Sequence, residues 1–352
     1  MNTINKLFDE RRKGPPSICV EMSGNHQGNK DGALKFLKLA HKSGADFLKV
    51  QVYTPDTITF NSKNSDFRVQ ALNEWSEYEN LYDLYSKAYT PWEWIEEIFK
   101  ESKKIGINTF ASPFDATAVQ FLEELNCPIY KIASPEITDI NLIRQCAKTG
   151  KPVILSTGLA NLDDIDEAVS VLKEENAEFL ILKCVSAYPT ELSEINISTM
   201  NLLKNRYQCN VGLSDHTIGC HAAYAATALG ATLIEKHFKI PGDKSSVDAG
   251  FSMELSELPI LKSSLKSIYS AIGTPTLELS KSAQVSYSGR RSLYVVDKIF
   301  KGDKFTNKNV RSIRPCFGMH PRYLSSIIGK RALFDIEPGS RMEWSLIDDS
   351  IE

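Results

Sequence analysis

Eight short apolar runs occur in the first 240 residues of the chain, each bounded by Gly, Pro, Asn or Asp, and longer amphipathic stretches lie between most of them. The runs are continuous rather than alternating, which is typical of strands buried on both faces of a parallel sheet. Eight strand-then-helix units predict a (β/α)8 TIM barrel, and this count favours it over a doubly wound open sheet, which periodicity alone leaves open. The predicted strands are 18–22, 46–51, 107–112, 128–133, 153–157, 179–185, 210–214 and 232–237.

The connection between the second and third predicted strands, 52–106, is much longer than the others and is rich in Trp and Tyr. Long loops at the mouth of a barrel often cover the substrate. Alternatively, these aromatic residues only pack an inserted pair of helices onto the barrel. The sequence leaves both interpretations open.

The C-terminal part of the chain has a different composition. A last amphipathic helix is predicted from 258 to about 273, and the stretch 274–288 is rich in Ser, Thr and Lys, as linkers are. From Arg290 onward, short strands and polar turns such as the Lys-Gly-Asp at 301–303 predict a small all-β module. We therefore expect a barrel over 1–275, a linker over 276–288 and the small module over 289–352.

Net charge and cysteine content exclude several classes of function. The chain has 41 Lys and Arg against 44 Asp and Glu, a formal net charge of −3, which argues against a polycation that binds nucleic acid. Its start is polar and lacks the apolar core of a secretion signal, and its apolar runs are too short to cross a membrane. The seven cysteines are scattered without a CxxC pair, which favours reduced thiols. We expect a cytoplasmic protein that binds neither nucleic acid nor a membrane.

Polar side chains are predicted at the C-terminal ends of all eight strands, where a barrel places its chemistry. Charged residues are rare in apolar strands unless they are paired or functional, so a full set of them indicates a site. Lys49, Lys131 and Lys183, with nearby hydroxyls, favour an anionic substrate; the alternative for each lysine is a salt bridge to a glutamate across the mouth. The set comprises Glu21, Asn25, Lys49, Gln51, Ser112, Lys131, Ser134, Ser156, Ser186, Tyr188, Ser214, His216, Glu235 and His237.

Two histidines, His216 and His237, end adjacent predicted strands. Two converging imidazoles suit a divalent transition metal whose other positions are filled by water and substrate, although both could equally be hydrogen-bonded core residues. Near them, Glu21 and Glu235 could act as general acid or base, or orient a ligand. His26, which follows a glycine, either stacks on substrate or caps a turn.

The strand-end strings together resemble the sialic acid synthase family. The matching strings are EMSGNHQG, DFLKVQ, FASPFD, YKIAS, STG, LKCVSAYPT, GLSDHTIG and EKHF, in the same order and spacing. The region from Arg290 resembles the antifreeze-like (SAF) module of that family, so the resemblance spans nearly the whole chain. It implies a barrel followed by an SAF module, and it makes a metal site the preferred interpretation of His216 and His237.

Within the family, the chain is most similar to the branch that makes pseudaminic acid. This similarity rests on the strings QVYTPDTIT, SSVDAGFSME and RSIRPCFGMHPRYL. Synthases of N-acetylneuraminate and of legionaminate share the barrel strings and are the alternatives. Ser186 stands where some sialate synthases have Asn, which also favours the pseudaminate branch.

The resemblance implies that phosphoenolpyruvate condenses with 2,4-diacetamido-2,4,6-trideoxy-L-altrose in open-chain form, giving a nine-carbon 2-keto acid and phosphate. It implies a divalent metal on His216 and His237, manganese with magnesium or cobalt as alternatives. Glu21 would stabilise positive charge at carbon 2 and activate water, and Glu235 would handle a proton on the sugar side. The resemblance assigns Lys49, Lys131, Ser112, Ser134, Ser156, Ser186 and Ser214 to phosphoenolpyruvate, and Asn25, Gln51, Tyr188 and Asp248 to the sugar.

The resemblance also implies a domain-swapped homodimer in which Arg314 of the module reaches the partner's site. Alternatively, Arg314 only ties the module to the barrel surface. A non-catalytic carbohydrate-binding protein is the remaining alternative. Against it stand the complete set of strand-end groups and the arginines of the module, since an ice-binding face is flat and uncharged.

Overall fold

The computed structural model of the chain describes residues 3–70 and 74–348. The chain divides into two compact units, Met1–Gly273 and Thr274–Glu352. No helix in the described ranges is long and apolar enough to span a membrane.

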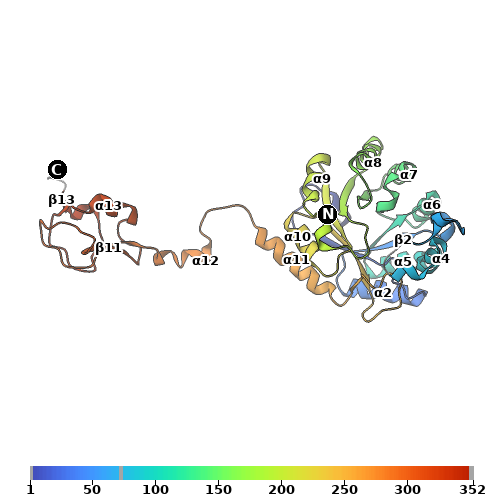
Figure 1. The fold of residues 1–352 in the computed structure, drawn as a ribbon, viewed down its shortest axis with the longest axis horizontal. Coiled ribbons are helices and arrows are strands. Elements are labelled where there is room, and N and C mark those ends of the chain that lie inside the picture. Colours follow the sequence, from blue (N-terminus) through green and yellow to red (C-terminus); the bar gives the residue numbers. More distant parts are fainter. Residues whose placement is uncertain (1–2, 71–73, 349–352) are drawn as a thin grey trace. The chain divides into compact units, whose positions relative to one another are not determined.

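The first unit is a closed parallel barrel (Figure 1). Its eight strands pair in chain order, and β1 also pairs with β8, which closes the sheet and confirms the predicted barrel over the open sheet. Each strand overlaps one of the predicted apolar runs. The strands are β1 (Ser17–Glu21), β2 (Phe47–Val52), β3 (Asn108–Pro113), β4 (Tyr130–Ile132), β5 (Val153–Ser156), β6 (Phe179–Cys184), β7 (Asn210–Asp215) and β8 (Leu233–Lys239), with a short β9 (Met253–Glu254) paired to β8.

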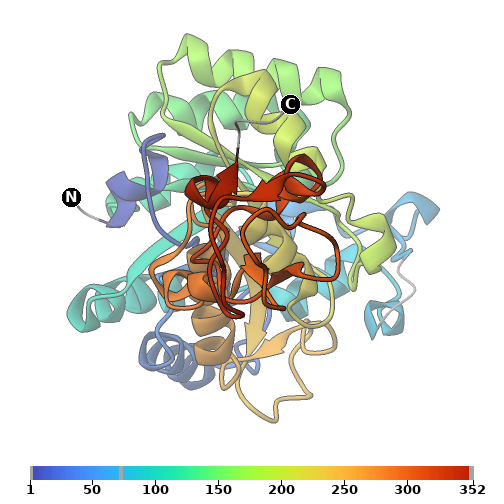
Figure 2. The same ribbon diagram turned by 90° about the vertical axis from the view of Figure 1, so that its left-hand side faces the viewer.

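Helices wrap around the outside of the barrel strands (Figures 1 and 2). Helix α8 illustrates how the sequence specifies them: Asn161 caps its first turn, and its apolar residues Ile165, Ala168 and Leu172 are buried against the sheet. The helices of this layer are α2 (Lys30–Lys42), α5 (Trp92–Ile105), α6 (Ala116–Glu124), α7 (Ile140–Lys148), α8 (Leu162–Glu174), α9 (Thr199–Tyr207), α10 (His221–Ala228) and α11 (Leu258–Ile272).

A short N-terminal helix, α1 (Thr3–Phe8), covers the end of the barrel where the strands begin. The side-chain amide of Asn210, the first residue of β7, donates to the carbonyls of Leu7 (3.0 Å) and Asp9 (3.1 Å). Leu7 is fully buried. The polar composition of this segment does not predict a helix, so α1 is a finding of the structure, and it seals the face opposite the strand ends.

The long connection after β2 holds α3 (Pro55–Ile58), η1 (Ser65–Phe67), η2 (Glu74–Glu77) and α4 (Leu81–Ala88) before α5 begins. Both interpretations of its aromatic residues apply. The Trp92 ring stacks on Phe121 with ring centroids 4.6 Å apart, and the Trp94 ring packs edge-on against His26, so these residues serve packing. Trp75 and Tyr85 instead line a cavity at the barrel mouth.

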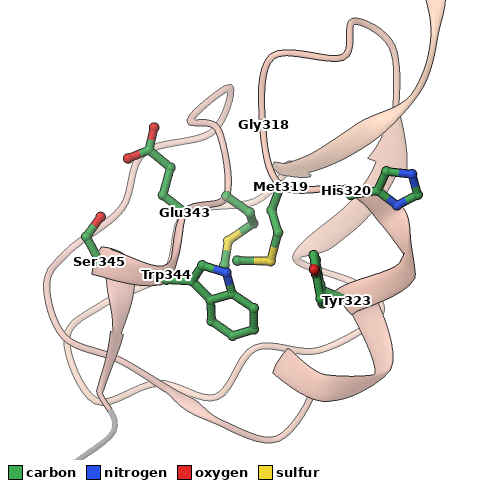
Figure 3. A pocket seen from close by; sticks show the side chains of 8 residues that line it. Gly318, Met319, His320, Tyr323, Glu343, Trp344 and Ser345 are labelled. Carbon is green, nitrogen blue, oxygen red and sulfur yellow. The ribbon is translucent and has the colours of Figure 1, made fainter.

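The second unit has its own apolar core around Leu293, Val310 and Met342. This unit contains two small antiparallel sheets, β10 (Ser292–Val295) with β11 (Val310–Ile313) and β12 (Arg331–Ala332) with β13 (Ile347–Asp348). Gly302, in the turn expected at 301–303, has a positive φ. A groove of about 420 Å³ on this unit lies beside the packed rings of Tyr323 and Trp344 (Figure 3).

The remaining short helices are η3 (Ser134–Thr138) and η4 (Leu192–Glu194) in the first unit, and α12 (Lys281–Gln284), η5 (Tyr287–Gly289), η6 (Pro321–Tyr323), α13 (Leu324–Ile327) and η7 (Trp344–Leu346) in the second.

Candidate active site

The candidate active site lies at the C-terminal ends of the barrel strands. Strand pairing brings Glu21 level with Lys49 on one side and with His237 on the other. Because side chains alternate along a strand, Glu235 and His237 point to the same face of β8, while Lys236 points to the other. The three strands β8, β1 and β2 therefore deliver one connected group of charged residues into the barrel.

Two glutamates and two lysines form a buried ion cluster. Lys49 Nζ lies 2.9 Å from Glu21 Oε2 and 3.5 Å from Glu235 Oε1, and Lys131 Nζ lies 3.0 Å from the same Glu235 oxygen. The exposed fraction of each side chain is 5% or less. The salt bridges foreseen as the alternative for these lysines are thus present in the structure.

The two glutamates of the cluster differ in proton affinity. Burial raises the pKa of Glu21, and its neighbour Lys49 offsets this effect only in part. Burial also acts on Glu235, but Lys131 and Lys49 outweigh it and hold the pKa of Glu235 well below its usual value. When the pKa values of two carboxyls in one site are shifted in opposite directions, one can act as an acid while the other stays ionised. When Glu21 is protonated, the cluster carries one net positive charge, which favours an anion.

Polar side chains extend the cluster across the mouth. Gln51 Nε2 donates to Glu21 Oε1 (3.0 Å), Ser214 Oγ donates to Glu235 Oε1 (3.0 Å), and Lys49 Nζ donates to Ser112 Oγ (3.4 Å). Ser134 Oγ accepts from the amide of Gly158 (2.9 Å). These contacts fix the hydroxyl and amide groups around the two lysines.

Gly158 follows β5 where several side chains converge. A Cβ atom at this position would lie 2.3 Å from Ser186 Oγ, 2.8 Å from Ser134 Oγ and 2.9 Å from Cys184 Sγ. Only glycine lets these three polar groups approach one another. The absence of a side chain at Gly158 therefore leaves the space that the hydroxyls of Ser134 and Ser186 occupy.

Several buried polar atoms around the cluster have no hydrogen-bond partner among the described residues. Native structures rarely leave such atoms unsatisfied, because each costs free energy comparable to a lost hydrogen bond. Their concentration here indicates a chamber that is completed by a polar ligand. The atoms are Asn25 Oδ1, Glu136 Oε2, Ser156 Oγ, Glu235 Oε2 and His237 Nδ1.

His216 and His237 face each other with ring centroids 5.3 Å apart. His216 Nδ1 lies 2.8 Å from the carbonyl of Val185, which can only accept, so Nδ1 carries the proton and Nε2 keeps its lone pair in the neutral ring. Burial and the adjacent His216 lower the pKa of His237, which keeps its ring neutral. Burial acts in the same direction on His216, but the neighbouring Cys184 outweighs it and raises the pKa of His216, so a metal would displace the proton from its Nε2 on binding.

No group of three or more His, Cys, Asp or Glu side chains within residues 3–70 and 74–348 is arranged to hold a metal ion. A metal at this pair would thus have two protein ligands and would take its others from water and substrate. The Nδ1 of His237 has no hydrogen-bond partner among the described residues and lies 3.9 Å from Asp248 Oδ2, and the Nε2 of His216 has a lone pair when the ring is neutral, so the two nitrogens fit such an ion.

A cavity of about 510 Å³ opens at the mouth next to the histidines. Gln51, Ser186, Tyr188, His237 and Asp248 supply polar groups to its lining. The Tyr188 ring packs against His216 with centroids 4.3 Å apart. The Asp248 carboxylate accepts from the amide of Gly24 at 3.1 Å.

The structure brings together the predicted residues of the barrel with few exceptions. Asn25 is buried next to the site, but its amide nitrogen donates to the carbonyl of Phe238 and to Ser252, so only its oxygen remains unpartnered. His26 accepts from the amide of Gly28, and so it caps a turn. Lys183 lies outside the ion cluster, because it occupies the alternate face of β6. Arg314 belongs to the second unit, directly after β11.

Two residues of this region were missed in the sequence. Glu136 lines the cavity, and burial raises its pKa to about 7. Its position two residues after Ser134, in the loop that follows β4, was the signal that could have identified it. Cys184 Sγ lies 3.8 Å from His216 Nδ1 and 3.8 Å from Ser186 Oγ, whereas the sequence pattern indicates only a reduced thiol.

Comparison with known proteins gives consistent similarities. The NeuB family description matches residues 36–276. A pseudaminic acid synthase of Campylobacter jejuni subsp. jejuni strain 81-176 is 40% identical over 98% of this chain and 97% of its own, and an N,N'-diacetyllegionaminic acid synthase of Campylobacter jejuni strain NCTC 11168 is 35% identical over 90% and 95%. The crystal structure of the N-acetylneuraminic acid (sialic acid) synthetase of Leptospira borgpetersenii serovar Hardjo-bovis in complex with citrate superposes with a TM-score of 0.69 and 31% identity, covering 78% of this chain and 90% of that one.

Proposed function

The chain belongs to the NeuB family, and from this premise we propose that it synthesises pseudaminic acid from phosphoenolpyruvate and 2,4-diacetamido-2,4,6-trideoxy-L-altrose. The identity of 40% to a pseudaminic acid synthase over nearly the full length of both chains supports this substrate. The observation that carries the chemistry is the buried ion cluster beside two facing histidines, bordered by polar atoms that lack partners.

In the proposed reaction, carbon 3 of phosphoenolpyruvate forms a bond to the aldehyde carbon of the sugar, and the aldehyde oxygen takes up a proton. Water adds to carbon 2, and its other proton is released to a base. The bond from carbon 2 to the phosphate oxygen of the tetrahedral species then breaks, the carbon 2 hydroxyl gives its proton to the leaving phosphate, and the 2-keto acid remains. Overall, phosphoenolpyruvate, the sugar and one water molecule give the nine-carbon acid and phosphate.

Lys49 and Lys131 are the cations that would bind the phosphate and carboxylate of phosphoenolpyruvate. Both are buried and paired, so an incoming anion exchanges with a glutamate rather than meeting a bare ammonium group. The hydroxyls of Ser112 and Ser214 lie in the same network, Ser134 is held by the amide of Gly158, and all three would supply neutral donors. Ser156, with its unpartnered Oγ, and Ser186 complete this group.

Glu21 is proposed to stabilise the positive charge at carbon 2 and to take a proton from the attacking water. Burial raises its pKa, which makes the carboxylate a stronger base toward the attacking water. The hydrogen bond from Gln51 holds one of its oxygens in place. Glu235, which stays ionised next to Lys131, would hold charge on the sugar side through its unpartnered Oε2.

A divalent metal, manganese with magnesium or cobalt as alternatives, fits His216 and His237 and would supply Lewis-acid polarisation of the aldehyde when bound. The hydrogen bond from His216 to the carbonyl of Val185 orients the ring of His216. The ring of Tyr188 lies against His216 and limits access of water to it. Tyr188, Gln51 and Asp248 would contact the sugar, since all three line the cavity.

The second unit is proposed to be an SAF module that lends Arg314 to the partner's site in a homodimer. The Arg314 side chain is exposed and makes no hydrogen bond or ion pair with residues that the structure describes. A free guanidinium suits an acetamido oxygen or a carboxylate. We also propose a cytoplasmic location, in keeping with seven cysteines that are all free thiols.

The test is phosphate release from phosphoenolpyruvate with added manganese, with the trideoxy altrose and N-acetylmannosamine in parallel, each with a chelator control. Release with the altrose alone, abolished by chelator and restored by metal, is the expected result. Glu21→Gln should bind phosphoenolpyruvate but turn over at least about a hundredfold more slowly. Release only with N-acetylmannosamine would overturn the sugar, and near-normal turnover of Glu21→Gln would overturn its role.

A further inference from the structure

The cavity beside the two histidines is lined by both polar and apolar side chains. The barrel side carries the polar groups already described together with Pro135, Leu159 and Val247, and the connection after β2 includes Gln70 and Tyr85. The connection after β2 supplies Ile58, Val69, Leu81 and Leu84, and Phe114 joins them from the end of β3. We call these five residues the apolar wall. None of them takes part in the chemistry proposed above.

The apolar wall is held by packing and hydrogen bonds. The Tyr53 ring lies edge-on between Phe114, with centroids 5.1 Å apart, and Tyr85, with centroids 5.6 Å apart. The Tyr82 hydroxyl donates to Asp56, which joins α4 to α3. A surface fixed in this way can discriminate between ligands, because it does not readily rearrange to suit a different one.

The side chains of the wall are only partly covered by protein. Leu84 is buried, with 5% of its surface exposed, whereas Ile58, Val69, Leu81 and Phe114 are half-buried and present carbon atoms to the cavity. Covering such carbon with a methyl group is favourable. Covering it with a hydroxyl that finds no partner is unfavourable.

We infer that the apolar wall determines which sugar is used: it receives the methyl-bearing end of the acceptor and selects against acceptors that carry hydroxyls there. This inference rests on the proposed function, in which the aldehyde lies at the histidine pair and the far end of the sugar points away from it. The proposed acceptor carries a methyl at carbon 6 and an acetamido methyl at carbon 4. N-acetylmannosamine carries hydroxyls at both carbons.

A substrate comparison tests the wall without altering the protein. The probe is the analogue of the proposed acceptor with a hydroxyl at carbon 6, compared with the trideoxy sugar on the metal-loaded full-length enzyme. We expect kcat/KM to fall by roughly 10- to 100-fold, the range for a small change in a hydrophobic pocket. Equal kcat/KM for the two sugars would overturn the inference.

Variants then locate the selectivity. Leu81→Asn and Ile58→Thr should lower the ratio of kcat/KM for the trideoxy sugar over the hydroxylated analogue by about tenfold or more. Leu39→Asn is the matched control, since Leu39 is a half-buried leucine of α2 outside the cavity, and its ratio should not change. Ile58→Thr is the smaller change and serves if Leu81→Asn does not fold.

The outcomes separate this inference from the proposed function. A wild-type enzyme that uses only N-acetylmannosamine would overturn both. A wild-type enzyme that prefers the trideoxy sugar, with the same ratio in both wall variants, would overturn the wall alone. A ratio that falls equally in Leu39→Asn would also overturn it, because the effect would then not come from the cavity.

Discussion

Lys236 and Asp215 form a second buried ion pair, behind the active site. Lys236 Nζ lies 3.0 Å from Asp215 Oδ2 and donates to the carbonyl of Thr217 at 2.5 Å. Asp215 Oδ1 accepts from the amide (2.9 Å) and the hydroxyl (2.8 Å) of Thr217. The exposed fraction of both charged side chains is 2% or less. The pair links β7 to β8 and supports the backbone on which His216 and His237 are mounted.

Lys236→Met removes the cation and leaves the Asp215 carboxylate buried without a counter-ion. Breaking a buried pair from one side costs about 3–5 kcal/mol of stability. Replacing both partners, in Lys236→Met/Asp215→Asn, removes both charges and keeps an oxygen for Thr217. We expect this double variant to lose only about 1–2 kcal/mol, less than Lys236→Met alone.

The assay is urea unfolding followed by tryptophan fluorescence in a Trp344→Phe background, so that the signal comes from Trp75, Trp92 and Trp94 of the barrel unit. Lys183→Met is the matched control, since Lys183 is a half-buried strand lysine whose ammonium donates to the carbonyl of Cys184. It should change the free energy of unfolding by about 1 kcal/mol or less. A loss below about 1 kcal/mol for Lys236→Met, or additive losses in the double variant, would refute the reasoning.

Two further predictions concern the module and the cavity. Arg314→Ala should leave folding and oligomeric state unchanged and lower kcat/KM by about tenfold or more, measured by phosphate release; full activity would mean that Arg314 only ties the module to the barrel. Burial raises the pKa of Glu136 to about 7, so the folded protein holds this proton more tightly than the unfolded chain, and stability is lost as pH rises from about 4.5 to 7. Glu136→Gln should therefore be more stable than the wild type at pH 8, by on the order of 1–2 kcal/mol, and should lose this advantage near pH 4.5; a pH-independent difference in urea unfolding would contradict this.

The barrel could be predicted because its strands are buried on both faces and so read as unbroken apolar runs. The charged residues at their ends were conspicuous for the same reason, since Glu21 and Lys49 interrupt sequences that are otherwise apolar. Alternation along β8 then separates Glu235 and His237, which share a face, from Lys236, which pairs with Asp215 behind the site.

Other features depend on tertiary contacts that leave no periodic signal. Helix α1 is short, and it docks on the barrel through the buried Leu7, through Ile4 and Phe8, which pack against the core, and through hydrogen bonds from Asn210. The apolar wall is built from residues scattered over the long connection, so their convergence on one cavity depends on how α3 and α4 pack. The position of Glu136 after Ser134 indicates that it lies near the site, but the burial that raises its pKa depends on tertiary contacts.

The pairing of Lys49 and Lys131 with two glutamates has a consequence for ligand traffic. If Lys49 and Lys131 bind phosphoenolpyruvate as proposed, its phosphate replaces a glutamate with which each lysine is already paired. The free energy of phosphate binding is then the difference between the energy of the lysine–phosphate pairs and that of the lysine–glutamate pairs, and this difference is far smaller than either energy alone. In the proposed reaction, Glu21 and Glu235 would pair again with the lysines as phosphate leaves, so the same carboxylates that weaken substrate binding would favour product release.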